Sequence, residues 1–155
     1  SENVNFTGWA VLWSWLCHAQ WLGLQCRPMQ GLHLTADLSD CQCALHWLTD
    51  AAQLGAACET AVRQAGLSPV GRLLHSFPAT PRGPGGVTAT VLLAESHVCI
   101  HTWPENASVT LDVYVCNFGA DHSAQARQLM AHLISIFQPG QCQQHALWRG
   151  QTPPA

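Results

Sequence analysis

The periodicity of the hydrophobic residues is the feature that most limits the fold of this chain. Residues 31–38 and 109–116 alternate apolar with polar side chains, as a half-buried strand does. Short runs with strand composition occupy 70–77, 87–94, 98–103 and a region around 144–148. Two stretches instead repeat apolar residues every three or four positions and predict amphipathic helices, at 44–65 and 126–137. The order strand, helix, four strands, helix, strand indicates one layered α/β sandwich.

Local signals predict where these elements begin and end. Ser39 or Asp40 is expected to cap the first helix, which would run for about six turns and end at Gly66. Pro139-Gly140 is expected to close the second helix. The segment P-A-T-P-R-G-P-G-G at 78–86 has the composition of a mobile loop.

The first 29 residues differ from the rest. Residues 6–24 are strongly apolar and contain four of the seven tryptophans, so they resemble a membrane span or a signal sequence. Three polar residues interrupt them, no Lys or Arg precedes them, and a length of about 19 residues is marginal for a span. We therefore expect 1–29 to be an N-terminal extension or a dimer-contact helix, with one domain at 30–150, a tail at 151–155 and no membrane function.

Composition excludes several classes of function. All six basic residues are arginine, so no lysine is present to form a pyridoxal-phosphate Schiff base, to act as a nucleophile or to hold a phosphate in a P-loop. A formal net charge of −3 without a basic cluster argues against nucleic-acid binding. The eight cysteines form no C-x-x-C pair and are too sparse for a disulfide scaffold. We expect a reducing, cytoplasmic compartment and no zinc site.

Reactive side chains are concentrated in one segment, A-E-S-H-V-C-I-H-T-W-P-E at 94–105. Two strands are expected to meet at Glu95-Ser96-His97, which would place a serine and two histidines, His97 and His101, at a tight turn. An ordinary hairpin would carry Gly, Asn or Asp there. Polar residues at this junction therefore indicate a site.

The motif E-S-H-V-C-I-H-T-W-P-E at 95–105 resembles the signature of the bacterial and archaeal S-adenosylmethionine decarboxylases, which are self-processing, pyruvoyl-dependent enzymes. The likeness continues in L-D-V-Y-V-C-N at 111–117 and in G-L-H-L at 31–34, and it spans residues 30–150. It implies an α+β fold: a two-layer sandwich with a mainly antiparallel sheet and two helices packed on one face. It also implies a homodimer of processed chain pairs that share active sites.

The resemblance marks Ser96 as the source of the pyruvoyl cofactor. Its hydroxyl would attack the carbonyl carbon of Glu95, and β-elimination of the ester would release chain 1–95 and leave a group that hydrolyses to pyruvoyl. Only a β-hydroxyl or a thiol permits both steps. The pyruvoyl carbonyl would form a Schiff base with S-adenosylmethionine and accept electrons as carbon dioxide leaves. The product would be the aminopropyl donor for spermidine synthesis.

By the same resemblance, Cys116 is the acid that protonates the α-carbon, and His101 transfers a proton during processing. Thr88 stands where the family usually has a serine that supports processing. Cys99 stands where serine or threonine is usual, and we expect only a small side chain to be needed there.

Three residues are expected to bind the substrate. Phe77 and Trp103 could stack on adenine, and their π-faces would favour the nearby sulfonium cation. Glu105 could accept hydrogen bonds from the ribose hydroxyls.

Other interpretations stay open. The altered loop and Thr88 leave open a pyruvoyl enzyme that decarboxylates a basic amino acid such as arginine or ornithine, and a processing-defective paralogue could act as a binding subunit. Cys116 could be a buried structural thiol, and Asp112 could satisfy backbone donors. Metal binding is disfavoured, because the spacing of His97 and His101 brings two ligands together on a helix but not in a strand.

Overall fold

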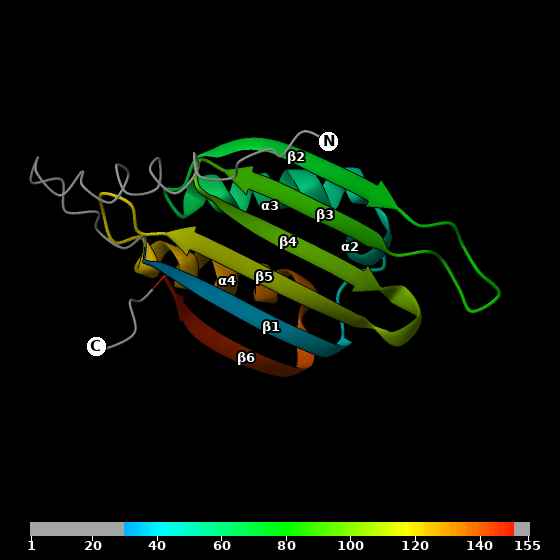
Figure 1. Cartoon of the computed structure of the whole chain (residues 1–155). Coiled ribbons are helices and arrows are strands. Elements are labelled where there is room, and N and C mark those ends of the chain that lie inside the picture. Colours follow the sequence, from blue (N-terminus) through cyan, green and yellow to red (C-terminus); the bar gives the residue numbers. More distant parts are fainter. Residues whose placement is uncertain (1–29, 151–155) are drawn as a thin grey trace, which may run out of the picture.

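The computed structural model describes residues 30–150 (Figure 1). The expected N-terminal extension at 1–29 and the tail at 151–155 lie outside the described residues. One sheet holds six strands, all paired antiparallel, in the order β2-β3-β4-β5-β1-β6. The strands are β1 (Gly31–Cys41), β2 (Pro69–Ser76), β3 (Val87–Leu93), β4 (Ser96–Trp103), β5 (Ser108–Cys116) and β6 (Pro139–Arg149).

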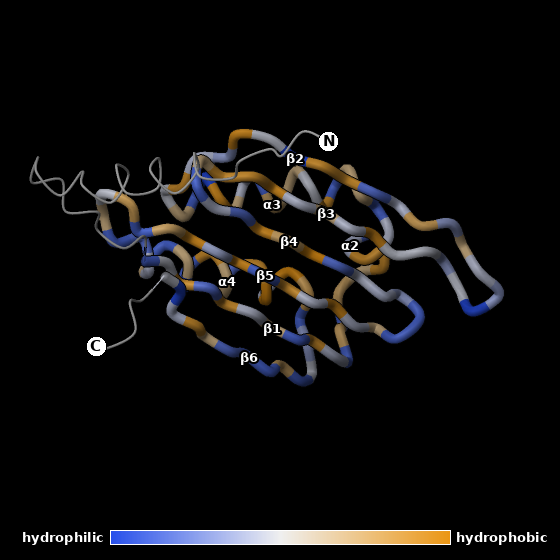
Figure 2. The backbone as a smooth tube through the Cα atoms, viewed as in Figure 1, coloured by the Kyte–Doolittle hydropathy of each residue, from blue (hydrophilic) through white to orange (hydrophobic). Residues whose placement is uncertain are grey.

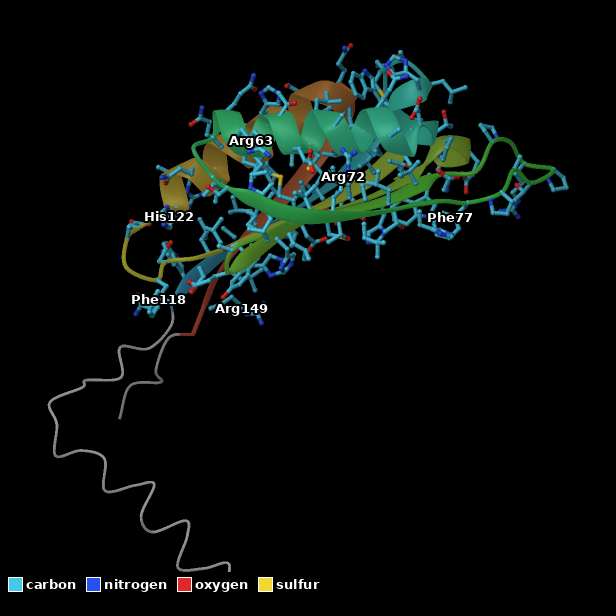
Figure 3. All side chains as sticks on the ribbon, turned by 90° about the horizontal axis from the view of Figure 1, so that it is seen from above. Arg63, Arg72, Phe77, Phe118, His122 and Arg149 are labelled. Carbon is cyan, nitrogen blue, oxygen red and sulfur yellow. The ribbon has the colours of Figure 1, made fainter. Side chains whose placement is uncertain are left out.

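The helices form the second layer. They are α2 (His46–Thr49), α3 (Ala51–Gln64) and α4 (Ser123–Phe137), with a single 3-10 turn, η2 (Pro104–Asn106), between β4 and β5. Viewed along the sheet, α3 and α4 lie on the same side of it (Figure 3). No helix within residues 30–150 combines the length and the apolar character needed to cross a membrane. The two-layer α+β architecture is as expected.

The core lies between the sheet and the helices. Alternate residues of the inner strands are buried, such as Val98 and Ile100 of β4, and they pack against Leu54 and Leu133 of the helices. Hydrophobic residues are frequent along β3, β4 and β5, whereas the edge strand β6 is mostly hydrophilic (Figure 2). The residues between the buried positions face away from the helices. We call this side of the sheet the open face, and it carries His33, Thr88, Thr90, His97, Cys99, His101, Thr110, Asp112 and Tyr114.

The first helix does not begin where the sequence signal predicts. β1 continues through Ser39 and Asp40 to Cys41, and pairing with β6 extends to this end of the strand. The helical stretch then divides at Asp50, whose carboxylate accepts a hydrogen bond of 3.0 Å from the amide of Gln53 and caps α3. That bond holds the pKa of Asp50 below its usual value. Strand pairing between distant segments therefore overrides the local capping signal at Asp40.

The second half follows the prediction more closely. α4 ends at Phe137, and the left-handed residue Gln138 turns the chain directly into β6. Pro139 and Gly140 are therefore the first residues of a strand, which is longer than the predicted 144–148. The expected loop at 78–86 joins β2 to β3, and Thr80 and Gly83 exchange two backbone hydrogen bonds near its tip.

One buried hydroxyl joins the sheet to the helices. Thr102 of β4 is only 4% exposed. Its Oγ1 donates to the carbonyl of Leu48 in α2 at 2.7 Å and accepts from the amide of Val87 in β3 at 2.8 Å. This threonine of the H-T-W-P segment therefore fixes the position of β4 against two neighbours.

We expect Thr102→Val to lower the free energy of unfolding by roughly 2 kcal/mol, because two buried backbone groups lose their partner. Urea denaturation at fixed protein concentration measures the free energy of unfolding. Every chain in this comparison also carries Ser96→Ala, so that self-cleavage cannot affect the result. Thr60→Val is the matched control, since the Thr60 hydroxyl is exposed on α3 and only contacts a carbonyl of its own helix. Equal midpoints for the two variants would show that Thr102 does not join the layers.

Candidate active site

The predicted site residues form two groups at opposite ends of β4. One group surrounds the β3–β4 hairpin and lines a cavity of about 420 Å³. The other lines a cavity of about 260 Å³ between the β2–β3 loop and the end of β4. In Figure 3, Phe118 and His122 mark the first end of the sheet and Phe77 marks the other.

Ser96 is the first residue of β4 and follows a two-residue turn, Ala94-Glu95, that pairs Leu93 with Ser96. Neither Ala94 nor Glu95 has a positive φ, so the turn is neither of the two types that hairpins of this length favour. The absence of Gly, Asn and Asp from this turn therefore agrees with its backbone conformation. Glu95 lies in the turn with its peptide bond to Ser96 at the edge of the cavity.

A hydrogen bond links Ser96 to the end of β5. The backbone amide of Cys116 donates to Ser96 Oγ at 2.9 Å. The Cys116 side chain is 5% exposed, and its Sγ lies 3.9 Å from the carbonyl oxygen of Gln30. A serine oxygen that accepts from an amide is stabilised when it carries negative charge. The structure thus brings together the predicted nucleophile and the predicted acid.

Several residues of this cavity, including a phenylalanine and a histidine, carried no expectation as site residues from the sequence. Phe118 and His122, from the segment between β5 and α4, line it together with Ser96 and Cys116. The Phe118 side chain is largely exposed. A polar segment before a helix gives no periodic signal, so nothing in the pattern distinguishes these two residues from an ordinary connection.

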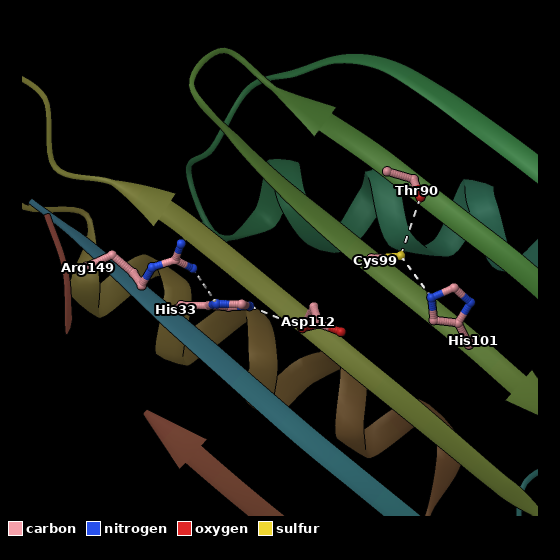
Figure 4. A network of polar contacts seen from close by, with 6 residues as sticks. All are labelled: His33, Thr90, Cys99, His101, Asp112 and Arg149. Carbon is pink, nitrogen blue, oxygen red and sulfur yellow. Dashed lines mark hydrogen bonds and ion pairs between the residues drawn. The ribbon is translucent and has the colours of Figure 1, made fainter. Parts of the chain in front are cut away.

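The second group is centred on His101. Thr88 and His101 are register partners on β3 and β4, and Thr88 Oγ1 lies 2.8 Å from His101 Nδ1. Cys99 Sγ lies 3.3 Å from the other ring nitrogen, Nε2 (Figure 4). The His101 and Trp103 rings are 6.1 Å apart. His101, Thr88 and the three predicted substrate-binding residues (Phe77, Trp103 and Glu105) all line the smaller cavity.

Ser96 and His101 do not meet within one chain. Five residue steps along an extended strand separate them, which at about 3.3 Å per step is roughly 17 Å. His101 also lies on the open face, because its neighbours Ile100 and Thr102 are buried. The expectation that a serine and two histidines share one turn is therefore wrong for His101. His97 does lie next to Ser96, but it is in the strand and not in the turn.

A further polar cluster crosses β1, β5 and β6 on the open face. His33 Nε2 lies 3.1 Å from Asp112 Oδ1, and Arg149 Nη1 lies 3.2 Å from His33 Nδ1 (Figure 4). Asp112 therefore binds a side chain and not the backbone donors considered for it. Burial is the main cause that lowers the pKa of the neighbouring His97, and the charge of nearby His33 lowers it further. In residues 30–150, no three His, Cys, Asp or Glu side chains are grouped closely enough to hold a metal ion.

Comparison with known proteins finds relatives in one family. Residues 32–150 match the family model described as S-adenosylmethionine decarboxylase. The chain is 39% identical over 129 residues to the S-adenosylmethionine decarboxylase proenzyme of Parasynechococcus marenigrum (strain WH8102), covering 82% of this chain and 90% of that one. It is 34% identical over 124 residues to the proenzyme of the same name from Persephonella marina, covering 79% and 84%.

A solved structure supports the same relationship. The crystal structure of the adenosylmethionine decarboxylase from Aquifex aeolicus aligns with a TM-score of 0.69 at 29% identity, covering 83% of this chain and 98% of that one. The sequence match, the coverage and the shared fold agree with each other. The chain therefore belongs to the S-adenosylmethionine decarboxylase family.

Proposed function

We propose that this chain is a decarboxylase of S-adenosylmethionine that makes its own pyruvoyl group from Ser96. The observation that carries the proposal is the hydrogen bond of 2.9 Å between Ser96 Oγ and the Cys116 amide, at the edge of the larger cavity. The named relatives favour S-adenosylmethionine as the substrate. No feature of the two cavities specifically favours arginine or ornithine.

Cleavage begins at the turn before β4. Ser96 Oγ attacks the carbonyl carbon of Glu95, the C–N bond between the two residues breaks, and the Ser96 nitrogen becomes a free amine. Loss of the Ser96 α-proton and of the ester oxygen from Cβ then releases the carboxylate of Glu95. Addition of water and loss of ammonia leave a carbonyl at the new chain end. The Cys116 amide supports the first step, because it stabilises charge on Ser96 Oγ.

The new carbonyl supplies an electron sink for decarboxylation. In this proposal the buried side chain of Cys116 is the group that donates a proton to the substrate. Phe118 and Leu67 give the cavity apolar walls, and His122 adds a polar group. The side chains of this cavity thus combine apolar walls with a group that delivers a proton.

The other half of the site comes from a second copy of the chain. His101, Phe77, Trp103 and Glu105 lie at the far end of β4, so they cannot reach Ser96 of their own chain. The open face, with the exposed side chains of Leu73 and Leu92 beside its polar rows, is the surface on which a partner would pack. We place the two-fold axis in the plane between two facing open faces, at right angles to the strands. Rotation about it puts the Ser96 end of one chain over the His101 end of its partner.

The cysteines support a cytoplasmic location. All six within the described residues are free thiols. Burial raises the pKa of Cys41 to about 11 and that of Cys58 to about 12, so both remain protonated and unreactive at neutral pH. A reducing compartment preserves this state.

We expect intact mass spectrometry to show two chains, 1–95 and 96–155, with a carbonyl on the second that reacts with hydrazine. Ser96→Ala should give one uncut chain. Carboxyl-labelled S-adenosylmethionine should release labelled carbon dioxide, and labelled arginine or ornithine should not. An uncut wild-type chain would support a binding subunit instead, and release from arginine or ornithine would reassign the substrate.

We expect Cys116→Ala to cleave normally, because the backbone amide that contacts Ser96 is kept. Its turnover of S-adenosylmethionine should fall by roughly 10²–10⁴-fold, as expected for a lost proton donor. Cys142→Ala, at an exposed position of β6, is the matched control. Unchanged turnover in Cys116→Ala would make this residue a structural thiol.

Mixing of two variants tests the shared site. Ser96→Ala and His101→Ala chains should each be inactive alone, whereas a mixed dimer contains one site with both residues. Random pairing on co-expression should therefore restore about a quarter of wild-type turnover, with cleavage confined to the His101→Ala chain. Failure of the mixture to regain any activity would mean that the two ends of β4 do not cooperate between chains.

A further inference from the structure

Four side chains form a line of polar contacts across β3 and β4 on the open face. Thr90 Oγ1 lies 3.4 Å from Cys99 Sγ, and Cys99 Sγ lies 3.3 Å from His101 Nε2. On the other side of the imidazole, Thr88 Oγ1 lies 2.8 Å from Nδ1. Figure 4 shows the sulfur of Cys99 between Thr90 and His101. Both ring nitrogens of His101 therefore have a partner.

The contact with His101 distinguishes Cys99 from a cysteine that only packs. Cys58, on α3, is 1% exposed within the core, and burial raises its pKa to about 12. Cys99 is only half-buried, on the polar side of the sheet. Its sulfur is within hydrogen-bond distance of two polar atoms. A small side chain that merely filled space would need neither contact.

The chemistry of the two partners suits a ring that gains and loses a proton. A hydroxyl and a thiol can each donate or accept a hydrogen bond. Thr88 and Cys99 can therefore hold His101 as either neutral tautomer, and also as the charged ring. Rotation of the imidazole about its last side-chain bond is otherwise weakly restricted. The two contacts keep the ring in one plane whichever nitrogen carries the proton.

We propose that Cys99 is a positioning residue that orients His101 for proton transfer, with Thr90 holding the sulfur in place. This inference rests on the proposed role of His101. It assigns a function to a position where the sequence pattern required only a small side chain. The thiol is a weak hydrogen-bond donor. Its contact with Nε2 can therefore orient the ring and still break easily when Nε2 must bind a proton from another group.

The test compares four variants of the full chain. Cys99→Ala removes both contacts, Cys99→Ser keeps a group that can donate and accept, and Thr90→Val removes only the contact behind the sulfur. Thr110→Val is the matched control, because Thr110 is the β5 register partner of His101 and makes no side-chain hydrogen bond to it. The rate of self-cleavage is followed by mass spectrometry for each.

We expect Cys99→Ala to slow cleavage by about 10-fold or more, by analogy with the second contact of metal-bound histidines. Cys99→Ser should restore most of the rate, Thr90→Val should have a smaller effect, and Thr110→Val should have none. Nitrogen-15 NMR of His101 in uncleaved Ser96→Ala chains should show altered signals from both ring nitrogens in Cys99→Ala. Cys99→Ser should lie near the parent chain.

The two measurements separate failure of this inference from failure of the proposed function. If the wild-type chain cleaves, but Cys99→Ala matches Thr110→Val in cleavage rate and in its His101 signals, Cys99 does not position the ring. If the wild-type chain does not cleave, the proposed function is wrong, and NMR alone decides whether Cys99 orients His101. Should Cys99→Ala fold poorly, Thr90→Val is compared with Thr110→Val instead, because it weakens the placement of the sulfur and keeps the Cys99 side chain.

Discussion

Alternation along β4 is the constraint on which the site depends. Val98, Ile100 and Thr102 are buried against the helices, so His97, Cys99 and His101 must lie on the open face. A slip of one residue would exchange the two sets and bury three polar side chains. The pairing register of β4 is therefore fixed by its buried residues and by hydrogen bonds near its two ends. Thr102 ties one end of β4 to α2 and β3, and Ser96 ties the other end to β5.

The same strand explains why the site is divided. An extended segment of five residues keeps Ser96 and His101 apart, and no rotation of their side chains closes roughly 17 Å. In a helix, the same five steps would advance only about 7.5 Å along the axis. A motif that is continuous in sequence can thus supply two different sites in space. In the proposed two-fold dimer, the motif of each chain would supply its Ser96 end to one site and its His101 end to the other.

The sequence predicts elements better than their junctions. Strand and helix periods identify the sandwich, since each depends on neighbours a few residues away. The full length of β6 and the contact of His33 with Asp112 and Arg149 depend on the sheet order β5-β1-β6. Local propensity carries no information on that order. The resemblance predicts Ser96, His101 and Cys116 as one set of site residues, and it carries no information on the distance that β4 places between Ser96 and His101.

By the resemblance, Thr88 and Cys99 stand where the family usually has other residues, and in the structure the two positions are not independent. Thr88 and Cys99 lie on different strands, yet each contacts a different nitrogen of the same imidazole. Thr88 carries a β-branch, which restricts its first side-chain torsion and leaves its hydroxyl less freedom to lose when it binds Nδ1. Cys99 offers Nε2 a weaker partner than a hydroxyl would. Thr88 and Cys99 thus contact one ring from its two sides, Thr88 with the stiffer side chain and Cys99 with the softer partner.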